Sequence, residues 1–379
     1  MSLDTAPSSS SHQIDRKEHL AENTENQKKP KETSCSNQDT AKPEKTPTEQ
    51  AGENIKVPGK TDDMTNSMFG TLIWWGWFVC TTVLLSYICL AGVVLFSKAA
   101  KMEVIFSNRF TAPWFWKLSD CHSYGLTSCE NLQLSTENGN QLGAWLISPY
   151  SRQIIVHDAY ILYLHGNGGS RGDSHCVNMY NKLTRLGYHV LAIDYRGFGD
   201  SEGFPTEEGL LEDAKAAYKL MAKRYSAFPL YIWGHSLGSA VAVQLAAWLN
   251  SDHSPNDLRL NGVILEAPFN NMVDGIRHTP LAAPIVSFVP DFESYVADVK
   301  SVFESSYWIQ KVSSPVVILH DTSDGIINIS LGRKLYQVAR DVGMMHVSMV
   351  EFKENLGHFQ IHASKKLRSV LQNFIQLSS

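Results

Sequence analysis

The alternation of apolar and polar positions divides the chain into three parts. Residues 1–63 are polar, and their few apolar side chains could not offset the entropy lost on ordering, so we expect a disordered tail. No charged residue then occurs from Met64 to Ser97. From about residue 125 to residue 379, short apolar runs alternate with amphipathic segments, which is typical of a globular domain.

The uncharged run predicts a transmembrane helix over residues 69–97. Leu72 to Phe96 is almost continuously apolar, and at about 1.5 Å per residue it can span a hydrocarbon core of roughly 30 Å. Tryptophans, which favour membrane interfaces, cluster at one end as Trp74, Trp75 and Trp77. A buried core helix is the alternative, but its length and lack of charge favour a single-pass anchor in a bilayer. Basic residues flank the run too evenly to fix its orientation.

The juxtamembrane segment 98–124 is rich in large apolar side chains. They include Ile105, Phe106, Phe110, Trp114, Phe115 and Trp116. Such a stretch can lie along the membrane surface or pack on the domain that follows, and the sequence leaves both alternatives open.

Residues 125–379 predict an α/β fold. Strands in "NLQL" and "QLGAWLISP" form a hairpin around the turn "ENGN". Further strand patterns occur in "YILYLH", "YHVLAIDY", "LYIW", "GVILEAPF", "PVVILH" and "VSMVEF". Helical patterns lie at 174–186, at 207–222 and directly after Ser236. This alternation predicts a mostly parallel sheet with helices on both faces.

Composition and charge exclude several classes of function. The 379 residues are 43% hydrophobic and 19% charged, with a net charge of −5. No Lys/Arg-rich run is present, so we expect no nucleic-acid partner. The 6 cysteines show no CxxC pair and no zinc-ligand spacing, so neither a metal nor another cofactor is expected. Free thiols are favoured, although a Cys121–Cys129 bridge would suit an oxidising compartment.

The segment "YIWGHSLGSAVAVQLAAW" changes abruptly from a strand pattern to an Ala-rich helix pattern. Gly-x-Ser-x-Gly at such a junction predicts a nucleophile elbow, a tight turn that exposes the hydroxyl of Ser236 at the end of the sheet. Gly234 and Gly238 are needed because the turn leaves no room for Cβ atoms. A helix N-cap would explain the serine but not both glycines.

A nucleophilic serine requires a base and an acid that orients the base. In this architecture they follow the serine in the order acid, then histidine, on loops after strands. The loop after "PVVILH" offers Asp321 and Asp324, and the loop after "VSMVEF" offers His358 and His362. We predict Asp324 as the acid, because Asp321 directly follows the strand and suits loop capping. We predict His358 as the base, because a glycine precedes it, whereas His362 suits the start of the last helix.

The glycine-rich run "LYLHGNGGSRG" at 162–172 follows the predicted third strand, where this architecture places an oxyanion donor. We predict that the backbone N–H groups of Asn167 and Leu237 form the oxyanion hole. A phosphate-binding loop is the alternative, but no Gly-Lys-Ser/Thr follows, and Arg171 alone supports it weakly.

These motifs together resemble the α/β-hydrolase superfamily, and more narrowly its membrane-anchored serine lipases acting on lysophosphatidylserine and monoacylglycerol. The resemblance rests on "YLHGNGGSRG", "LGYHVLAIDYRGFGDSEG", "LYIWGHSLG", "ILEAPFNN" and "LGRKLYQVA". It implies a nucleophile at Ser236, an acid at Asp324, a base at His358 and an oxyanion turn at Asn167. It also implies that Arg196 and Asp200 brace the loop near the site without reacting, and that the catalytic domain lies in the endoplasmic reticulum lumen or outside the cell.

The acid loop "HDTSDGIIN" departs from the usual pattern of this family, His-Gly/Ala-x-x-Asp-x-x-Val-Pro. Asp321 is an additional carboxylate, which could raise the pKa of one of the two aspartates in this loop. Asn328 begins an N-glycosylation sequon, Asn-Ile-Ser, whose place beside the acid loop would hinder its modification.

The leading hypothesis is a lipase that cleaves the acyl ester of single-chain glycerolipids. The apolar, proline-punctuated insertion at about 270–311 predicts a mobile cap over the site, with ordinary packing as the alternative. A protein S-acyl thioesterase could use the same residues, and a non-catalytic, membrane-anchored lipid-binding protein is the remaining possibility. Ser236 excludes an epoxide hydrolase or dehalogenase, which would need an aspartate there.

Overall fold

A computed structural model describes residues 60–106, 117–149, 159–255, 258–277 and 283–378. The tail that we expected to be disordered lies outside these residues up to position 59. Contacts between residues define one unit up to Met68 and a second unit from Phe69 to Ser379, which contains the sheet.

Helix α1 spans Lys60–Phe96 and contains the predicted membrane segment. Its Met68–Phe96 stretch of 29 residues is long and apolar enough to cross a membrane, and its most apolar part is not buried in the protein. No other helix in the described ranges meets both criteria. The helix therefore agrees in position with the span expected at 69–97.

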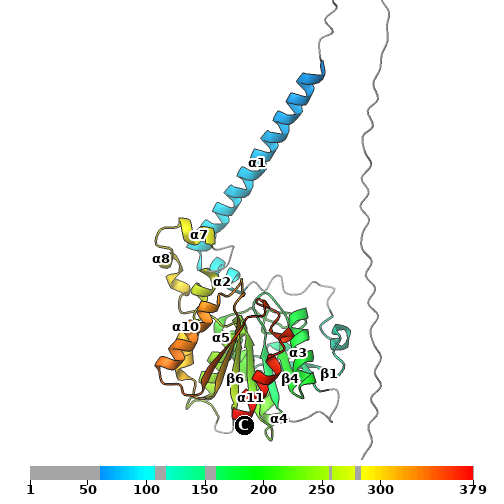
Figure 1. The fold of residues 1–379 in the computed structure, drawn as a ribbon, viewed down its shortest axis with the longest axis vertical. Coiled ribbons are helices and arrows are strands. Elements are labelled where there is room, and N and C mark those ends of the chain that lie inside the picture. The colour runs from blue at the N-terminus through cyan, green and yellow to red at the C-terminus, as the bar shows by residue number, and fades with distance from the viewer. Residues whose placement is uncertain (1–59, 107–116, 150–158, 256–257, 278–282, 379) are drawn as a thin grey trace, which may run out of the picture. The chain divides into compact units, whose positions relative to one another are not determined.

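The second unit is built around a sheet (Figure 1), which has 8 strands in the order β1-β2-β4-β3-β5-β6-β7-β8. The strands are β1 Cys129–Ser135, β2 Gln141–Ile147, β3 Tyr160–Leu164, β4 His189–Ile193, β5 Leu230–His235, β6 Gly262–Glu266, β7 Val316–Asp321 and β8 Val347–Phe352. β2 pairs antiparallel with both β1 and β4, and all later pairs are parallel. The predicted hairpin and the mostly parallel sheet are both confirmed.

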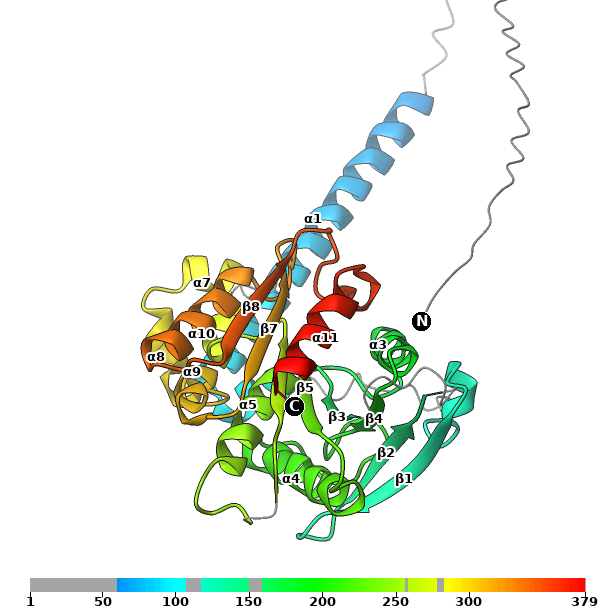
Figure 2. The same cartoon turned by 60° about the horizontal axis from the view of Figure 1, so that its bottom comes forward.

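Helices cover both faces of the sheet (Figure 2), because successive side chains of each buried strand point to opposite sides. On one face, α4 (Glu207–Arg224), α5 (Leu237–Leu249) and α10 (Ile329–Asp341) pack on alternate strand residues such as Leu162 and Ile232. On the other face, α3 (Ser174–Arg185) and α11 (Leu367–Ser378) pack on the intervening residues, such as Ile161 and Tyr163. The domain thus has two separate apolar layers, one on each face of the sheet.

The parallel register places the ends of the central strands at one edge. Leu164 at the end of β3 pairs with Gly234 of β5, and His235 pairs with Glu266 at the end of β6. Since ligands of such sheets bind beyond the carboxyl ends of the strands, the loops after β3, β5 and β7 are brought to the same region.

The insertion between β6 and β7 forms short helices. They are α6 Met272–Arg277, α7 Ala283–Phe288, α8 Phe292–Val296, η4 Ala297–Val299, α9 Ser305–Trp308 and η5 Ile309–Lys311. None of these described helices exceeds 6 residues, which agrees with the proline-punctuated sequence. Residues 278–282 of the insertion lie outside the described ranges.

Part of the juxtamembrane segment packs on the domain. In helix α2 (Lys98–Phe106), Ile105 and Phe106 are both only 2% exposed and belong to the apolar core. Lys101 is also buried, and its Nζ lies 2.7 Å from Asp298 Oδ1 in the insertion. Packing on the domain is therefore the correct alternative for α2. The aromatic residues expected with it at 110–116 lie outside the described ranges.

Cys121 and Cys129 form a disulfide. The bridge joins the turn η2 (Cys121–Tyr124) to the start of β1. Our preference for free thiols is therefore wrong for this pair, because the turn brings two cysteines 8 positions apart side by side. Among the described cysteines, Cys80, Cys89 and Cys176 are free thiols.

Candidate active site

Ser236 lies in the turn between β5 and α5. Its backbone has φ 53° and ψ −116°, a conformation that side-chain-bearing residues rarely adopt outside functional turns. A Cβ at Gly234 would lie 2.2 Å from the Gly238 carbonyl oxygen, and one at Gly238 would lie 2.0 Å from the Leu164 carbonyl oxygen. The two glycines are thus required by backbone contacts, as the predicted elbow demands.

The structure brings Asp324 and His358 together. His358 Nδ1 lies 2.7 Å from Asp324 Oδ2, and both residues are buried. In the neutral tautomer whose Nδ1–H donates to this carboxylate, Nε2 is the ring nitrogen that can accept a proton. Ser236 and His358 line the same cavity.

Asp324 is also held by groups that the sequence did not reveal. His320 Nε2 lies 3.3 Å from Asp324 Oδ2, and the backbone N–H groups of Ile326 and Ile327 each donate to Oδ1 at 2.9 Å. Burial opposes ionisation of Asp324, but the hydrogen bonds from His320 and His358 outweigh it and hold its pKa well below the usual value. Asp324 is therefore ionised at neutral pH.

Neither Asp321 nor Asp324 has a raised pKa, although we had considered that one of these two neighbouring carboxylates could raise the pKa of the other. Asp321 is the last residue of β7, and its Oδ1 accepts hydrogen bonds from Ser323 N at 2.8 Å and from Gly357 N at 3.3 Å. Burial raises the pKa of Asp321, but these hydrogen bonds lower it by more. Asp321 thus caps its loop, as expected, and also joins it to the loop of the histidine.

His362 lies in the turn η6 (Ile361–Ala363), and α11 begins only at Leu367. Our placement of His362 at the start of the last helix is therefore wrong, because Ser364 ends the turn in an extended conformation. Asn328 caps α10 with its side-chain oxygen, which accepts from Ser330 N at 3.0 Å, and the residue is exposed. The sequon is consequently less obstructed than its position in the sequence suggested.

The loop after β3 lies directly against the elbow. A Cβ at Gly166 would lie 2.9 Å from His235 Nδ1 and 3.3 Å from Ser236 Cβ. Asn167 follows, and its side-chain Nδ2 donates to the carbonyl oxygen of Ile105 in α2. Leu237 is the first residue of α5, so its N–H has no acceptor within the helix. Both predicted oxyanion donors therefore lie next to the serine in sequence or in space.

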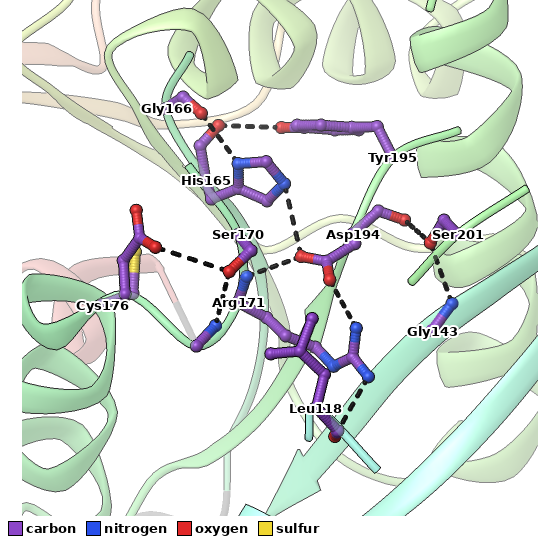
Figure 3. Close-up of polar contacts among 12 residues, drawn as sticks. Leu118, Gly143, His165, Gly166, Ser170, Arg171, Cys176, Asp194, Tyr195 and Ser201 are labelled. Carbon is purple, nitrogen blue, oxygen red and sulfur yellow. Dashed lines mark hydrogen bonds and ion pairs between the residues drawn. The ribbon is translucent and has the colours of Figure 1, made fainter. Parts of the chain in front are cut away.

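A buried ion pair fixes the far end of this loop (Figure 3). The guanidinium of Arg171 contacts both Asp194 and Asp200, and its backbone N–H donates to Asp194 Oδ1 at 2.5 Å. His165, at the start of the loop, places Nε2 3.5 Å from the same Asp194 oxygen. Burial lowers the pKa of Arg171, but the two carboxylates raise it by more, so the guanidinium is charged. Arg171 and Asp194 thus clamp the glycine-rich loop.

Arg196, which we expected to brace the loop near the site together with Asp200, contacts another element instead. Its side chain bonds Asp213 at 2.8 Å and Glu212 at 3.2 Å, both in α4. Asp200 does brace the loop, but through Arg171, with Nη1 2.6 Å from Oδ1. The expectation for Arg196 is wrong, because the turn after β4 directs its side chain toward α4 instead of the site loop.

The site opens into a cavity of about 510 Å³, a size that suits a small organic ligand. Its lining residues are Gly166, Asn167, Gly168, Gly169, Asp173, Ser174, His175, His235, Ser236, Ile326, His358 and Phe359. Burial lowers the pKa of His175 to about 4 and that of His235 well below its usual value. Both rings are therefore neutral near the serine at physiological pH.

The described residues contain one cluster with metal-ligand spacing, Cys121, His122 and Cys129. Both thiols of this cluster are consumed by the disulfide, so they are not available as thiolate ligands.

Solved structures share this fold. An α/β-hydrolase from Vibrio vulnificus matches with a TM-score of 0.55 at 19% identity, covering 75% of this chain and 94% of its own. The Pyrococcus furiosus esterase Pf2001 matches with a TM-score of 0.54 at 18% identity, covering 71% and 96%. A family profile described as serine aminopeptidase, S33 matches residues 156–289. The protein is an α/β-hydrolase of the serine hydrolase type.

Sequence relatives narrow this class. The lysophosphatidylserine lipase ABHD12 of Danio rerio is 33% identical over 313 residues, covering 76% of this chain and 81% of its own. The enzyme of the same name from Mus musculus is 33% identical over 326 residues, covering 79% and 81%. Protein ABHD12B of Homo sapiens is 33% identical over 292 residues, covering 72% and 79%. The chain belongs to the ABHD12 family, and it is a carboxylic ester hydrolase.

Proposed function

We propose that this protein hydrolyses the acyl ester of single-chain glycerolipids, namely lysophospholipids such as lysophosphatidylserine and also monoacylglycerols. The observation that carries the proposal is the hydrogen bond of 2.7 Å between Asp324 and His358, together with the cavity that both His358 and Ser236 line. The names of the ABHD12 relatives support the choice of lysophosphatidylserine as a substrate.

The arrangement supports a two-step reaction through an acyl-enzyme. Ser236 Oγ attacks the ester carbonyl carbon while His358 Nε2 takes the hydroxyl proton, and Asp324 stabilises the resulting imidazolium. The N–H groups of Asn167 and Leu237 hold the oxyanion. His358 then returns the proton to the departing glycerol oxygen. In the second step, water gives a proton to His358, attacks the acyl-enzyme and releases the fatty acid, and Ser236 regains its proton.

We further propose that α1 anchors the protein in a bilayer as a single pass, with the catalytic domain in the endoplasmic reticulum lumen or outside the cell. The length and exposure of the apolar stretch Met68–Phe96 support the anchor. The Cys121–Cys129 disulfide supports a compartment that permits disulfides.

The insertion between β6 and β7 and the size of the cavity favour a substrate with a single acyl chain. The insertion between β6 and β7 exposes Phe288 and Tyr307 to solvent, which is an arrangement suited to contact with lipid. Each CH₂ group transferred into an apolar site recovers about 0.8 kcal/mol, and the cavity of about 510 Å³ offers Ile326 and Phe359 for such contact, although its described lining contains no residue of the insertion. Two or three chains would need a wider opening, which is why we expect triacylglycerols to be poor substrates.

The test is a substrate panel given to the purified full-length protein in mixed micelles, with Ser236→Ala as the matched control. Monoacylglycerol, lysophosphatidylserine, triacylglycerol and S-acylated peptide are compared by released fatty acid, and active serine is counted with a fluorophosphonate probe. We expect serine-dependent turnover of the single-chain lipids. Turnover of only the peptide would indicate a thioesterase, and lipid binding without turnover or probe labelling would indicate a binding protein.

A further inference from the structure

A second cavity adjoins the proposed active site. Its volume is about 520 Å³, and it is lined by Tyr124, Gly172, Asp173, Ser174, His175, Val177 and Asn178. Asp173, Ser174 and His175 also line the cavity that contains Ser236. The two cavities therefore share a wall at the start of α3, and the side chains of this wall can be contacted from either cavity.

Asp173 is the only carboxylate in the described lining of either cavity, and neither lining contains Lys or Arg. The histidine shared by the two cavities does not supply a positive charge, because burial lowers the pKa of His175 to about 4. The wall between the cavities is thus negatively charged when Asp173 is ionised.

The carboxylate of Asp173 is poorly compensated by the protein. It is half-buried, and within the described part of the chain no Lys, Arg or His nitrogen makes an ion pair with it. Ser170 supplies hydrogen bonds from its backbone N–H and from Oγ, which lies 3.4 Å from Oδ1, but burial outweighs them and raises the pKa of Asp173. Although Asp173 precedes α3, its side chain makes no capping hydrogen bond to the helix. Partial burial of a carboxylate without a cation is unfavourable, so a cationic ligand group would be stabilised there.

The same carboxylate lies over the glycine-rich loop. A Cβ at Gly169 would be only 2.3 Å from Asp173 Oδ2. A group bound by Asp173 is therefore held close to the loop that carries the predicted oxyanion donor Asn167, within the cavity that Ser236 also lines. This places a charge-recognising group beside the reacting centre.

We propose that Asp173 binds the primary ammonium of the substrate headgroup, so that the second cavity receives the polar end of an aminophospholipid with one acyl chain. This assignment rests on the proposed function, because it requires a glycerolipid ester at Ser236. An N–H of the ammonium donates to the carboxylate, which a trimethylated choline nitrogen cannot do. Serine and ethanolamine headgroups are therefore preferred over choline and glycerol headgroups.

The experiment compares lipids that carry the same acyl chain and differ only in headgroup. Lysophosphatidylserine and lysophosphatidylethanolamine carry the ammonium, lysophosphatidylcholine carries a methylated nitrogen, and lysophosphatidylglycerol and monoacylglycerol carry none. The full-length protein is measured as wild type, as Asp173→Asn and as Asp252→Asn, which changes an exposed aspartate outside both cavities.

Asp173→Asn is expected to lower kcat/KM for the two ammonium lipids about 10- to 100-fold relative to monoacylglycerol, mainly through KM. The ratio of kcat/KM for lysophosphatidylglycerol to kcat/KM for monoacylglycerol is expected to stay level or rise, because the substitution removes a carboxylate that repels the anionic headgroup. Asp252→Asn should leave every ratio unchanged.

An equal fall for all lipids would show that Asp173 only supports the fold at the start of α3, and the headgroup assignment would be wrong. Unchanged ratios in an active Asp173→Asn protein would overturn it as well. If wild type hydrolyses none of the glycerolipids but does hydrolyse S-acylated peptides, the proposed function itself fails, which is a different result.

Discussion

Arg171 is contacted by two carboxylates that differ in exposure, and this pair allows a matched test of the clamp on the glycine-rich loop. The side chains of Arg171 and Asp194 are both 0% exposed, whereas that of Asp200 is 43% exposed. The perturbations are Asp194→Asn and Asp200→Asn, which remove one negative charge each with little change of shape. Both substitutions act on the same guanidinium, so any difference in stability between the two variants reflects the different burial of the two carboxylates.

The expected magnitudes follow from that difference. Removing one partner of a buried charge pair costs about 3–5 kcal/mol, because the remaining charge is left without compensation. An ion pair with an exposed partner contributes only about 0–1 kcal/mol. At about 2–4 °C per kcal/mol for a domain of this size, Asp194→Asn should lower Tm by roughly 6–20 °C and Asp200→Asn by less than about 4 °C.

The assay is thermal unfolding of the detergent-solubilised protein, followed by tryptophan fluorescence because Trp145 and Trp233 are fully buried. Ester hydrolysis below the transition is measured in parallel, and Asp194→Asn is expected to lower kcat more than Asp200→Asn, since only Asp194 also holds the Arg171 backbone N–H. Equal Tm values for the two variants, or a larger decrease of Tm in Asp200→Asn, would refute the reasoning from burial.

Three further expectations concern the acid and base, the pH dependence and the anchor. Hydrolysis should fall by several orders of magnitude in Asp324→Asn and His358→Ala but much less in Asp321→Asn and His362→Ala, and a reversed order for the two aspartates would disprove the choice of acid. Burial raises the pKa of Glu266 from 4.5 to about 8, so its stabilising contribution is complete below about pH 4.5 and is lost as the pH rises through 8. Wild type should therefore lose roughly 3–5 kcal/mol more stability than Glu266→Gln between pH 5 and 9, as measured by denaturant unfolding, and parallel pH profiles would contradict this. The full-length protein should resist extraction with alkaline carbonate, and a chain lacking residues 1–97 should be largely soluble; recovery of the full-length chain in the soluble fraction would exclude the anchor.

The elbow was predictable because its constraints are local. Gly234 and Gly238 are needed within a few residues of Ser236, and the change from strand to helix occurs in the same short segment. The order of the strands then predicts which loops can supply Asp324 and His358, since parallel strands end at one edge of the sheet.

Other contacts join residues that lie far apart in the sequence, so no local motif predicts them. Asp194 and Arg171 are 23 positions apart, and Lys101 and Asp298 are 197 positions apart. The sequence indicated a bracing role for the "DYRGFGDS" segment but not which side chains turn inward, so Arg196 was chosen where Asp194 does the bracing. His320 was also missed, because a histidine inside an apolar strand resembles an ordinary core residue.

Helix α2 has a consequence for how membrane segments could be exchanged between relatives. Its Lys101 contacts Asp298 in the insertion, and the carbonyl oxygen of Ile105 accepts the side chain of Asn167 in the loop beside Ser236. Residues 98–106 are therefore part of the catalytic unit, although they adjoin the apolar helix in sequence. Ser97, between α1 and α2, is the natural crossover point for a chimaera. A graft joined after residue 106 would replace these contacts with a foreign sequence, whereas one joined at Ser97 would keep them and lose only the contact of Phe96 with Tyr295 and the buried Leu95.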